Sequence, residues 1–169
     1  MNPMRNIRIE KVTLNIGAGK DAARLEKGMG LLKNITGVDP VKTFTRKRIP
    51  EWGLRPGLAI GCKVTLRKDM ADKILARLID AKEHKLTRRQ FDNEGNVAFG
   101  IHEYMDIPGV KYDPAIGIMG LEVCITLERP GFRIKRRGIQ RKRIPVRHKI
   151  SKEEAIAFIK EKCNVRVDE

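Results

Sequence analysis

The chain has 169 residues, of which 36 are Lys or Arg and 21 are Asp or Glu, so its formal net charge is +15. Its hydrophobic fraction of 41% is typical of a globular protein, and so large a positive surplus favours an anionic partner. No apolar run is long enough to span a membrane, and the three cysteines lie too far apart for a disulfide framework or a metal site. We therefore expect a single domain over residues 1–169, in a reducing compartment, with no membrane partner.

The positive charge is concentrated in two segments. Residues 42–68 contain eight basic residues and one acid, and residues 129–149 contain ten basic residues and no acid. The remaining 121 residues together carry a net charge of only −2. A solvated surface usually mixes charges of both signs, so an acid-free stretch of this length indicates binding to a polyanion such as a nucleic acid. We call residues 46–57 the basic loop and residues 129–149 the basic tract.

The first part of the chain predicts a strand, a turn and a helix. Apolar and polar residues alternate over residues 7–16, and the first isoleucines are out of phase with the later ones, which predicts either a bulge or a separate segment that leads into the strand. A helix is expected from Asp21 to a stop at Gly37. Gly28 and Gly30 within this helix predict close packing on a sheet.

Two more strands flank the basic loop. Residues 41–45 predict a short strand and residues 59–67 the clearest strand of the chain, whereas the loop between them is interrupted by proline and glycine. Asp69 is then expected to cap a helix over residues 70–83.

Strands also dominate the second half. Residues 92–95 predict a turn, and residues 96–101 and 121–128 predict strands. Ser151 and Glu154 have the spacing of a capping box that opens a final helix. Because the strands are half polar, the predicted fold class is α+β, a two-layer sandwich of a mainly antiparallel sheet with helices on one face and an open face.

Six polar residues of the two best strands would lie on that open face: Lys11, Thr13, Asn15, Lys63, Thr65 and Arg67. Lys and Arg neutralise phosphates, while Thr and Asn hydrogen-bond to phosphate, sugar or base edges. The absence of aromatic residues favours structured RNA over a single strand, which would stack on Phe or Tyr. An ordinary solvated sheet face is the alternative, and strand spacing alone does not separate the two.

Trp52, the only tryptophan, lies in the basic loop. Tryptophans are mostly buried, so a core position is the first interpretation. Its neighbours show no apolar pattern, and stacking against RNA is the second. We expect both basic segments to be mobile in the isolated protein, because no apolar residues anchor them.

Catalytic and metal-binding patterns are weak. Gly17 and Gly19 follow a strand as phosphate-binding glycines do, but the rest of that motif is absent. Asp92 and Glu94 lack the other ligands of a calcium loop, and no histidine has metal-site spacing. We therefore predict a protein that is not an enzyme and needs no cofactor or metal. The alternatives are a nucleic-acid-processing enzyme and an architectural DNA-binding protein.

Four segments resemble characteristic stretches of the ribosomal protein L5 family of the large subunit. They are residues 8–19 (RIEKVTLNIGAG), 35–41 (ITGVDPV), 57–67 (GLAIGCKVTLR) and 91–96 (FDNEGN), in family order over nearly the whole chain. The basic tract resembles the archaeal and eukaryotic branch of this family. So does the sequence HKISKEEA at residues 148–155, which overlaps the last two residues of the tract.

This resemblance implies a cytoplasmic ribosomal protein that binds 5S rRNA in the central protuberance. By motif, Asn15 and Thr65 would contact 5S rRNA, and Trp52 matches the aromatic residue of the family's basic loop. The resemblance also implies contact between that loop and the P-site tRNA, through Arg46, Lys47, Arg48 and Arg55. A bridge to a small-subunit head protein would lie near residues 87–91 and 107–118.

We further expect the basic tract to anchor the protein between elements of large-subunit rRNA. The residues expected to do so are Arg133, Lys135, Arg136, Arg137, Arg141, Lys142 and Arg143.

Overall fold

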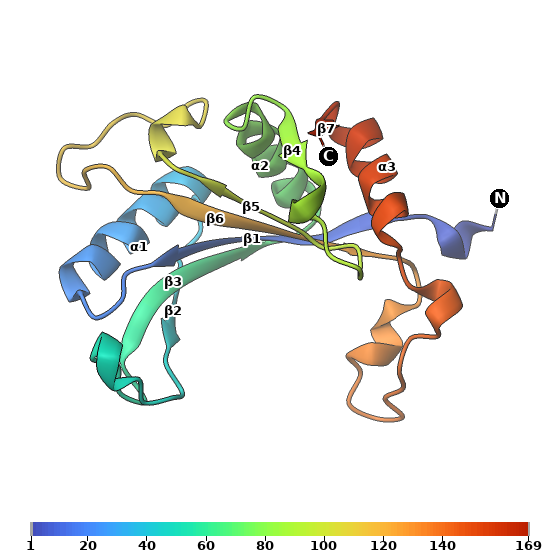
Figure 1. Ribbon diagram of the computed structural model, residues 1–169, viewed down its shortest axis with the longest axis horizontal. Helices are drawn as coiled ribbons and strands as arrows, with labels where there is room; N and C mark the ends of the chain where they lie inside the picture. Colours follow the sequence, from blue (N-terminus) through green and yellow to red (C-terminus); the bar gives the residue numbers. More distant parts are fainter. Residues whose placement is uncertain (1, 169) are drawn as a thin grey trace.

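The computed structural model describes residues 2–168, and its central element is a five-stranded antiparallel sheet. In spatial order the strands are β2 (Val41–Phe44), β3 (Ala59–Leu66), β1 (Arg8–Gly17), β6 (Leu121–Glu128) and β5 (Val97–Ile101). Three helices lie on one side of the sheet: α1 (Ala22–Thr36), α2 (Lys68–Asp80) and α3 (Lys152–Cys163) (Figure 1). The predicted α+β sandwich is therefore confirmed.

Strand β1 lies between β3 and β6 and organises the core. Its residues Val12 and Leu14 are fully buried beneath the helices, and the side chains between them point to the opposite face. The register against β6 shifts between Ile9 and Lys11, which confirms the predicted bulge.

Helix α1 begins and ends as predicted. The carboxylate of Asp21 accepts hydrogen bonds from the first backbone N–H groups of the helix, and Gly37 ends it in the left-handed conformation, with φ of 70°. Gly28 lies against the sheet, where an added Cβ would be 3.2 Å from Ile16 Cγ2. Gly30 faces open space, so the prediction of close packing is wrong for this residue.

Helix α2 begins earlier than predicted. The capping residue is Arg67 rather than Asp69, because β3 ends at Leu66 and the chain enters the helix at once. Asp69 lies in the first turn, where its charge still favours the helix dipole. The helix also ends at Asp80 rather than 83, and the residues that follow it include two with positive φ.

A small second sheet was not predicted from the sequence. Strands β4 (Lys85–Thr87) and β7 (Arg166–Asp168) pair in parallel on the helical side of the molecule (Figure 1). Each has only three residues, too few for an alternation pattern, and their pairing joins distant parts of the chain.

The other face of the five-stranded sheet has no helix over it. The basic loop and the basic tract extend from opposite ends of the sheet, and both project on this uncovered side (Figure 1). Among residues 2–168, no helix is long and apolar enough to cross a membrane.

Candidate nucleic-acid interface

The uncovered face brings the predicted polar residues of β1 and β3 together. Thr13 lies opposite Thr65, and Asn15 lies opposite Lys63. Because side chains alternate along a strand, burial of the intervening apolar residues directs these four toward solvent. Lys63, Thr65 and Arg67 are exposed, whereas Lys11, Thr13 and Asn15 are half-buried, so the predicted face exists as one continuous surface.

Two carboxylates on this side of the sheet were missed by sequence reasoning. The Asn15 side-chain amide donates a hydrogen bond of 3.3 Å to Glu122 of the neighbouring β6, and the Arg67 guanidinium lies 3.4 Å from the Glu10 carboxylate. Glu122 lies between two inward residues of β6, so the sequence could have predicted that its side chain faces outward. The sequence could not have predicted that Glu122 lies beside Asn15, because this depends on the order of the strands. These contacts hold the polar side chains in fixed directions.

Cys124 of β6 lies opposite Thr13 on the same face. Burial, followed by the nearby charge of Glu122, raises the pKa of its thiol. Burial likewise raises the pKa of the Cys62 and Cys163 thiols. Protonated thiols are poor nucleophiles. Within the described part of the chain, no three His, Cys, Asp or Glu side chains are placed to hold a metal ion.

The basic loop has a compact internal structure. Ile49 and Leu54 exchange two backbone hydrogen bonds of 3.1 and 3.0 Å around a short 3₁₀ helix (Pro50–Trp52). Leu54 is buried, whereas Trp52 is 66% exposed. The core interpretation of Trp52 is therefore wrong, because Leu54 fills the apolar position. The expectation that nothing apolar anchors the loop is also wrong.

All four predicted tRNA-contacting cations of the loop are exposed: Arg46, Lys47, Arg48 and Arg55. Across residues 2–168 no carboxylate forms an ion pair with any of them. The Thr45 hydroxyl donates a 3.0 Å hydrogen bond to the Lys47 carbonyl and steadies the backbone at the loop's start. Their charge is therefore not neutralised by any carboxylate in the part of the chain that the structure describes.

One buried arginine closes the base of the basic tract. The Arg129 side chain is only 4% exposed, and its guanidinium donates to the carbonyls of His148 and Lys149 and to the Glu154 carboxylate, the last at 2.6 Å. Within the tract, Phe132 is partly buried and packs against the core, and Ile150, directly after the tract, is fully buried. The sequence-based expectation that nothing apolar anchors the tract is therefore wrong.

Arg136 attaches the middle of the tract to the body. It forms ion pairs with Glu10 and with Glu128, the latter at 2.7 Å, and both carboxylates are nearly buried. This arginine, expected to contact rRNA, is thus engaged within the protein. Arg137 donates to the Gln140 carbonyl at 2.9 Å. The other expected anchoring cations have no ion-pair partner in the structure from residue 2 to 168: Arg133, Lys135, Arg141, Lys142 and Arg143.

Comparison with known proteins identifies the family. Residues 2–55 match the model of ribosomal protein L5, and residues 59–164 match the model of the C-terminus of the same ribosomal family. The large ribosomal subunit protein uL5 of Sulfurisphaera tokodaii is 49% identical over 100% of this chain and 96% of that protein. The uL5 proteins of Nanoarchaeum equitans and Methanoculleus marisnigri are 50% and 46% identical, over 98% and 99% of this chain and 98% and 100% of their own length. The chain therefore belongs to the ribosomal protein L5 family, whose members are non-enzymatic components of the large ribosomal subunit in the cytoplasm.

Proposed function

We propose that the uncovered face of the sheet binds 5S rRNA and helps to attach it in the central protuberance of the large subunit. The observation that supports this most strongly is the pair of cross-strand contacts, Thr13 opposite Thr65 and Asn15 opposite Lys63, on a face that no helix covers. Hydroxyl and amide groups beside cations are the chemistry that holds phosphates, sugars and base edges.

The shape of the face supports folded RNA rather than an unpaired strand. The strands β3, β1, β6 and β5 present threonines, Ala98 and Gly100 on this face without an aromatic side chain for base stacking, whereas the exposed aromatic Phe44 lies on the edge strand β2. Small side chains allow an RNA backbone to approach closely. The basic loop and the basic tract then supply positive charge at both ends of the bound RNA (Figure 1).

The basic loop is the proposed contact for the P-site tRNA. Its four unpaired cations attract a backbone, and the exposed ring of Trp52 offers a flat apolar surface beside them. The bridge to a small-subunit head protein is assigned to residues 107–118, where Tyr112 and Ile118 are 53% and 70% exposed. In the other bridge segment Phe91 is buried and Thr87, Arg88 and Arg89 are exposed, and Arg88 also lies 3.7 Å from the Glu153 carboxylate.

The Asn15→Ala/Thr65→Ala double variant tests the 5S rRNA face. We expect its affinity for an archaeal 5S rRNA transcript in filter binding to fall by roughly one order of magnitude, because hydrogen bonds to charged phosphate groups are lost. Circular dichroism should remain that of the unchanged protein, since both side chains point away from the core.

The matched control is Asn34→Ala, which removes an exposed amide from α1 on the opposite side of the molecule. Its affinity should not change. Duplex DNA added across a salt series should compete only weakly at moderate salt, because non-specific binding falls steeply as salt rises. Unchanged 5S rRNA affinity in the double variant would refute this face, and equal competition by DNA would refute RNA specificity.

A further inference from the structure

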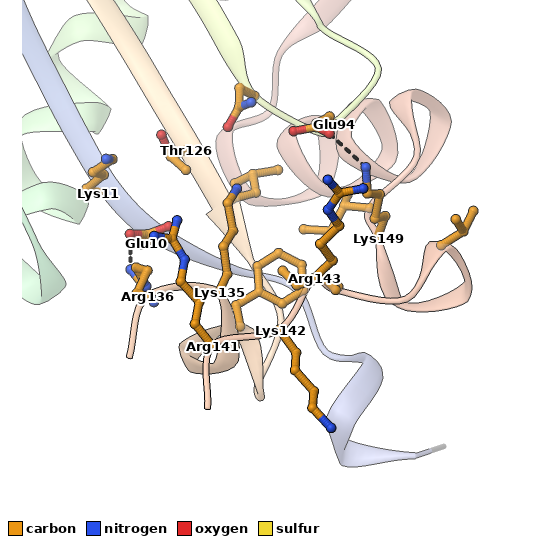
Figure 2. A pocket seen from close by; sticks show the side chains of 16 residues that line it. Glu10, Lys11, Glu94, Thr126, Lys135, Arg136, Arg141, Lys142, Arg143 and Lys149 are labelled. Carbon is orange, nitrogen blue, oxygen red and sulfur yellow. Dashed lines mark hydrogen bonds and ion pairs between the residues drawn. The ribbon is translucent and has the colours of Figure 1, made fainter. Parts of the chain in front are cut away.

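A pocket of about 860 Å³ lies between the uncovered face and the basic tract (Figure 2). On the sheet side it is lined by Lys11 and Thr126, which are neighbours across β1 and β6. Seven of its lining residues are Lys or Arg and two are Glu. The pocket is thus continuous with the proposed 5S rRNA face and much more positive than it.

Both carboxylates of the pocket already have cationic partners. Glu10 pairs with Arg136, and Glu94 pairs with Lys149 at 2.8 Å. The hydrogen bond from Lys149, then the charges of Lys149 and Lys135, lower the pKa of the Glu94 carboxyl, which therefore stays charged and paired at neutral pH. The other cations of the pocket have no acid to satisfy them there.

Three of those cations line the pocket from the side of the tract. Figure 2 shows Arg141 extending toward Glu10, Lys135 toward Thr126 and Arg143 toward Glu94 and Lys149, while Lys142 extends the other way. None of the three forms an ion pair with a described residue. Like charges repel one another, so three unpaired cations along one pocket require a fixed backbone around them.

The ion pairs of the pocket provide that support. Arg136 fastens the tract to Glu10, and Lys149 fastens its far end to Glu94. Within the tract, the Lys142 backbone N–H donates to the Ile134 carbonyl at 3.1 Å. A preformed site loses less conformational freedom on binding than a disordered tail does. Arginine forks in such a site match the oxygens of a phosphate.

We infer that this pocket binds the sugar–phosphate backbone of the RNA that lies on the uncovered face, with Arg141 and Arg143 as its phosphate ligands. Lys135 and Lys11 add positive charge, and the Thr126 hydroxyl is placed to donate to a phosphate or a ribose. The inference rests on the proposed 5S rRNA function, because Lys11 belongs to both surfaces. From the sequence we expected these arginines to contact large-subunit rRNA, but the pocket lies beside Lys11 and Thr126 of the uncovered face, so its phosphate site is assigned to the RNA bound there.

The test compares two pairs of arginines. Arg141→Gln/Arg143→Gln removes the proposed ligands, and Arg147→Gln/Arg166→Gln removes the same charge from exposed positions that do not line the pocket. In filter binding of the archaeal 5S rRNA transcript, we expect the first pair to lose roughly tenfold or more in affinity. The plot of log affinity against log salt should become shallower by about 1.4–1.8, for two phosphate contacts. The second pair should lose less than about threefold.

Hydroxyl-radical footprinting measures which RNA backbone positions the protein protects from cleavage. A general loss of positive charge should not remove protection from one specific segment. The Arg141→Gln/Arg143→Gln variant should lose protection of one continuous backbone segment, and the control pair should keep it. Equal losses by both pairs, or no loss by the first, would overturn the inference. If Asn15→Ala/Thr65→Ala weakens binding while Arg141→Gln/Arg143→Gln does not, only the pocket is refuted. If the unaltered protein does not bind 5S rRNA, the proposed function fails with it.

Discussion

The basic loop and the basic tract project on the same side of the sheet, but they are held in different ways. The loop is stabilised by its own backbone, through the paired hydrogen bonds of Ile49 and Leu54, and by burial of the Leu54 side chain. The tract is attached to the rest of the protein by ion pairs. Arg129, Arg136 and Lys149 of the tract pair with carboxylates elsewhere in the chain.

This difference has a physical origin. Glu51 is the one acid of the loop, and Pro50 and Gly53 favour a tight turn that needs no outside partner. The tract has ten basic residues and no acid, so its cations repel one another and its counter-charges must come from the body of the protein. A region of high charge is therefore ordered either by local turn chemistry or by distant counter-charges, and the two respond differently to mutation and pH.

The largest expected effect is removal of the arginine at the base of the tract. Arg129→Ala should lower the free energy of unfolding by about 3 kcal/mol, because it leaves Glu154 and two backbone carbonyls without their donor and opens space in a buried position. Urea unfolding followed by circular dichroism measures this loss.

Arg133→Ala is the control for that experiment, because it removes an exposed arginine of the same tract. Its cost should be below about 0.5 kcal/mol. If the two variants were equally stable, the tract would not depend on the Arg129 contacts. That result would contradict the claim that the tract, unlike the loop, is held by ion pairs with the rest of the chain.

A smaller effect is expected from the apolar anchor of the loop. Leu54→Ala should cost about 2 kcal/mol, at the low end for a buried leucine because the loop lies at the edge of the fold. Hydrogen exchange should show faster opening over residues 46–57 and unchanged protection over 129–149. Ile139→Ala, at a residue of the tract that is 85% exposed, should leave stability unchanged. Loosening of both segments by Leu54→Ala would show that they are coupled rather than independent.

The smallest effect is a pH response confined to the tract. The hydrogen bond and charge of Lys149 lower the pKa of Glu94 below the usual 4.5. A carboxyl group whose pKa is lowered by folding stabilises the folded state at pH values above its unfolded pKa, and this contribution disappears as the pH falls through the folded pKa. We therefore expect the tract to loosen on acidification below about pH 4.5.

Nuclear magnetic resonance can follow this titration at two backbone N–H groups. The Lys142 N–H, bonded to Ile134 within the tract, should broaden or shift as the ion pair between Glu94 and Lys149 is lost. The Leu54 N–H, bonded to Ile49 within the loop, should stay unchanged. Parallel responses of the two signals would contradict the claim that only the tract depends on counter-charges.

Local signals in the sequence were sufficient for most elements of the fold. The cap at Asp21, the glycine stop at Gly37 and the capping box of Ser151 and Glu154 each depend on residues within about one turn of the helix end, and all were predicted. Asp69 was misplaced because the strand before it runs directly into the helix, which leaves no room for a separate cap.

The candidate site divides in the same way. Alternation along β1 and β3 predicted which side chains face outward, because strand geometry directs successive residues to opposite faces. It could not predict that Asn15 meets Glu122 or that Lys11 meets Thr126, since these neighbours come from β6. Trp52 was ambiguous because burial depends on which apolar residue of the loop turns inward, and that residue is Leu54.

By itself, the sequence determined the positions of the two basic segments, the alternation that makes one face polar, and the motifs of the L5 family. These properties depend on residues close together in the chain. Only the tertiary structure decided which cations are free, because Arg136 lies 126 residues from Glu10 and Lys149 lies 55 residues from Glu94. Charges separated by such distances in sequence meet only after the sheet has formed, and their pairing leaves Arg141 and Arg143 directed into the pocket.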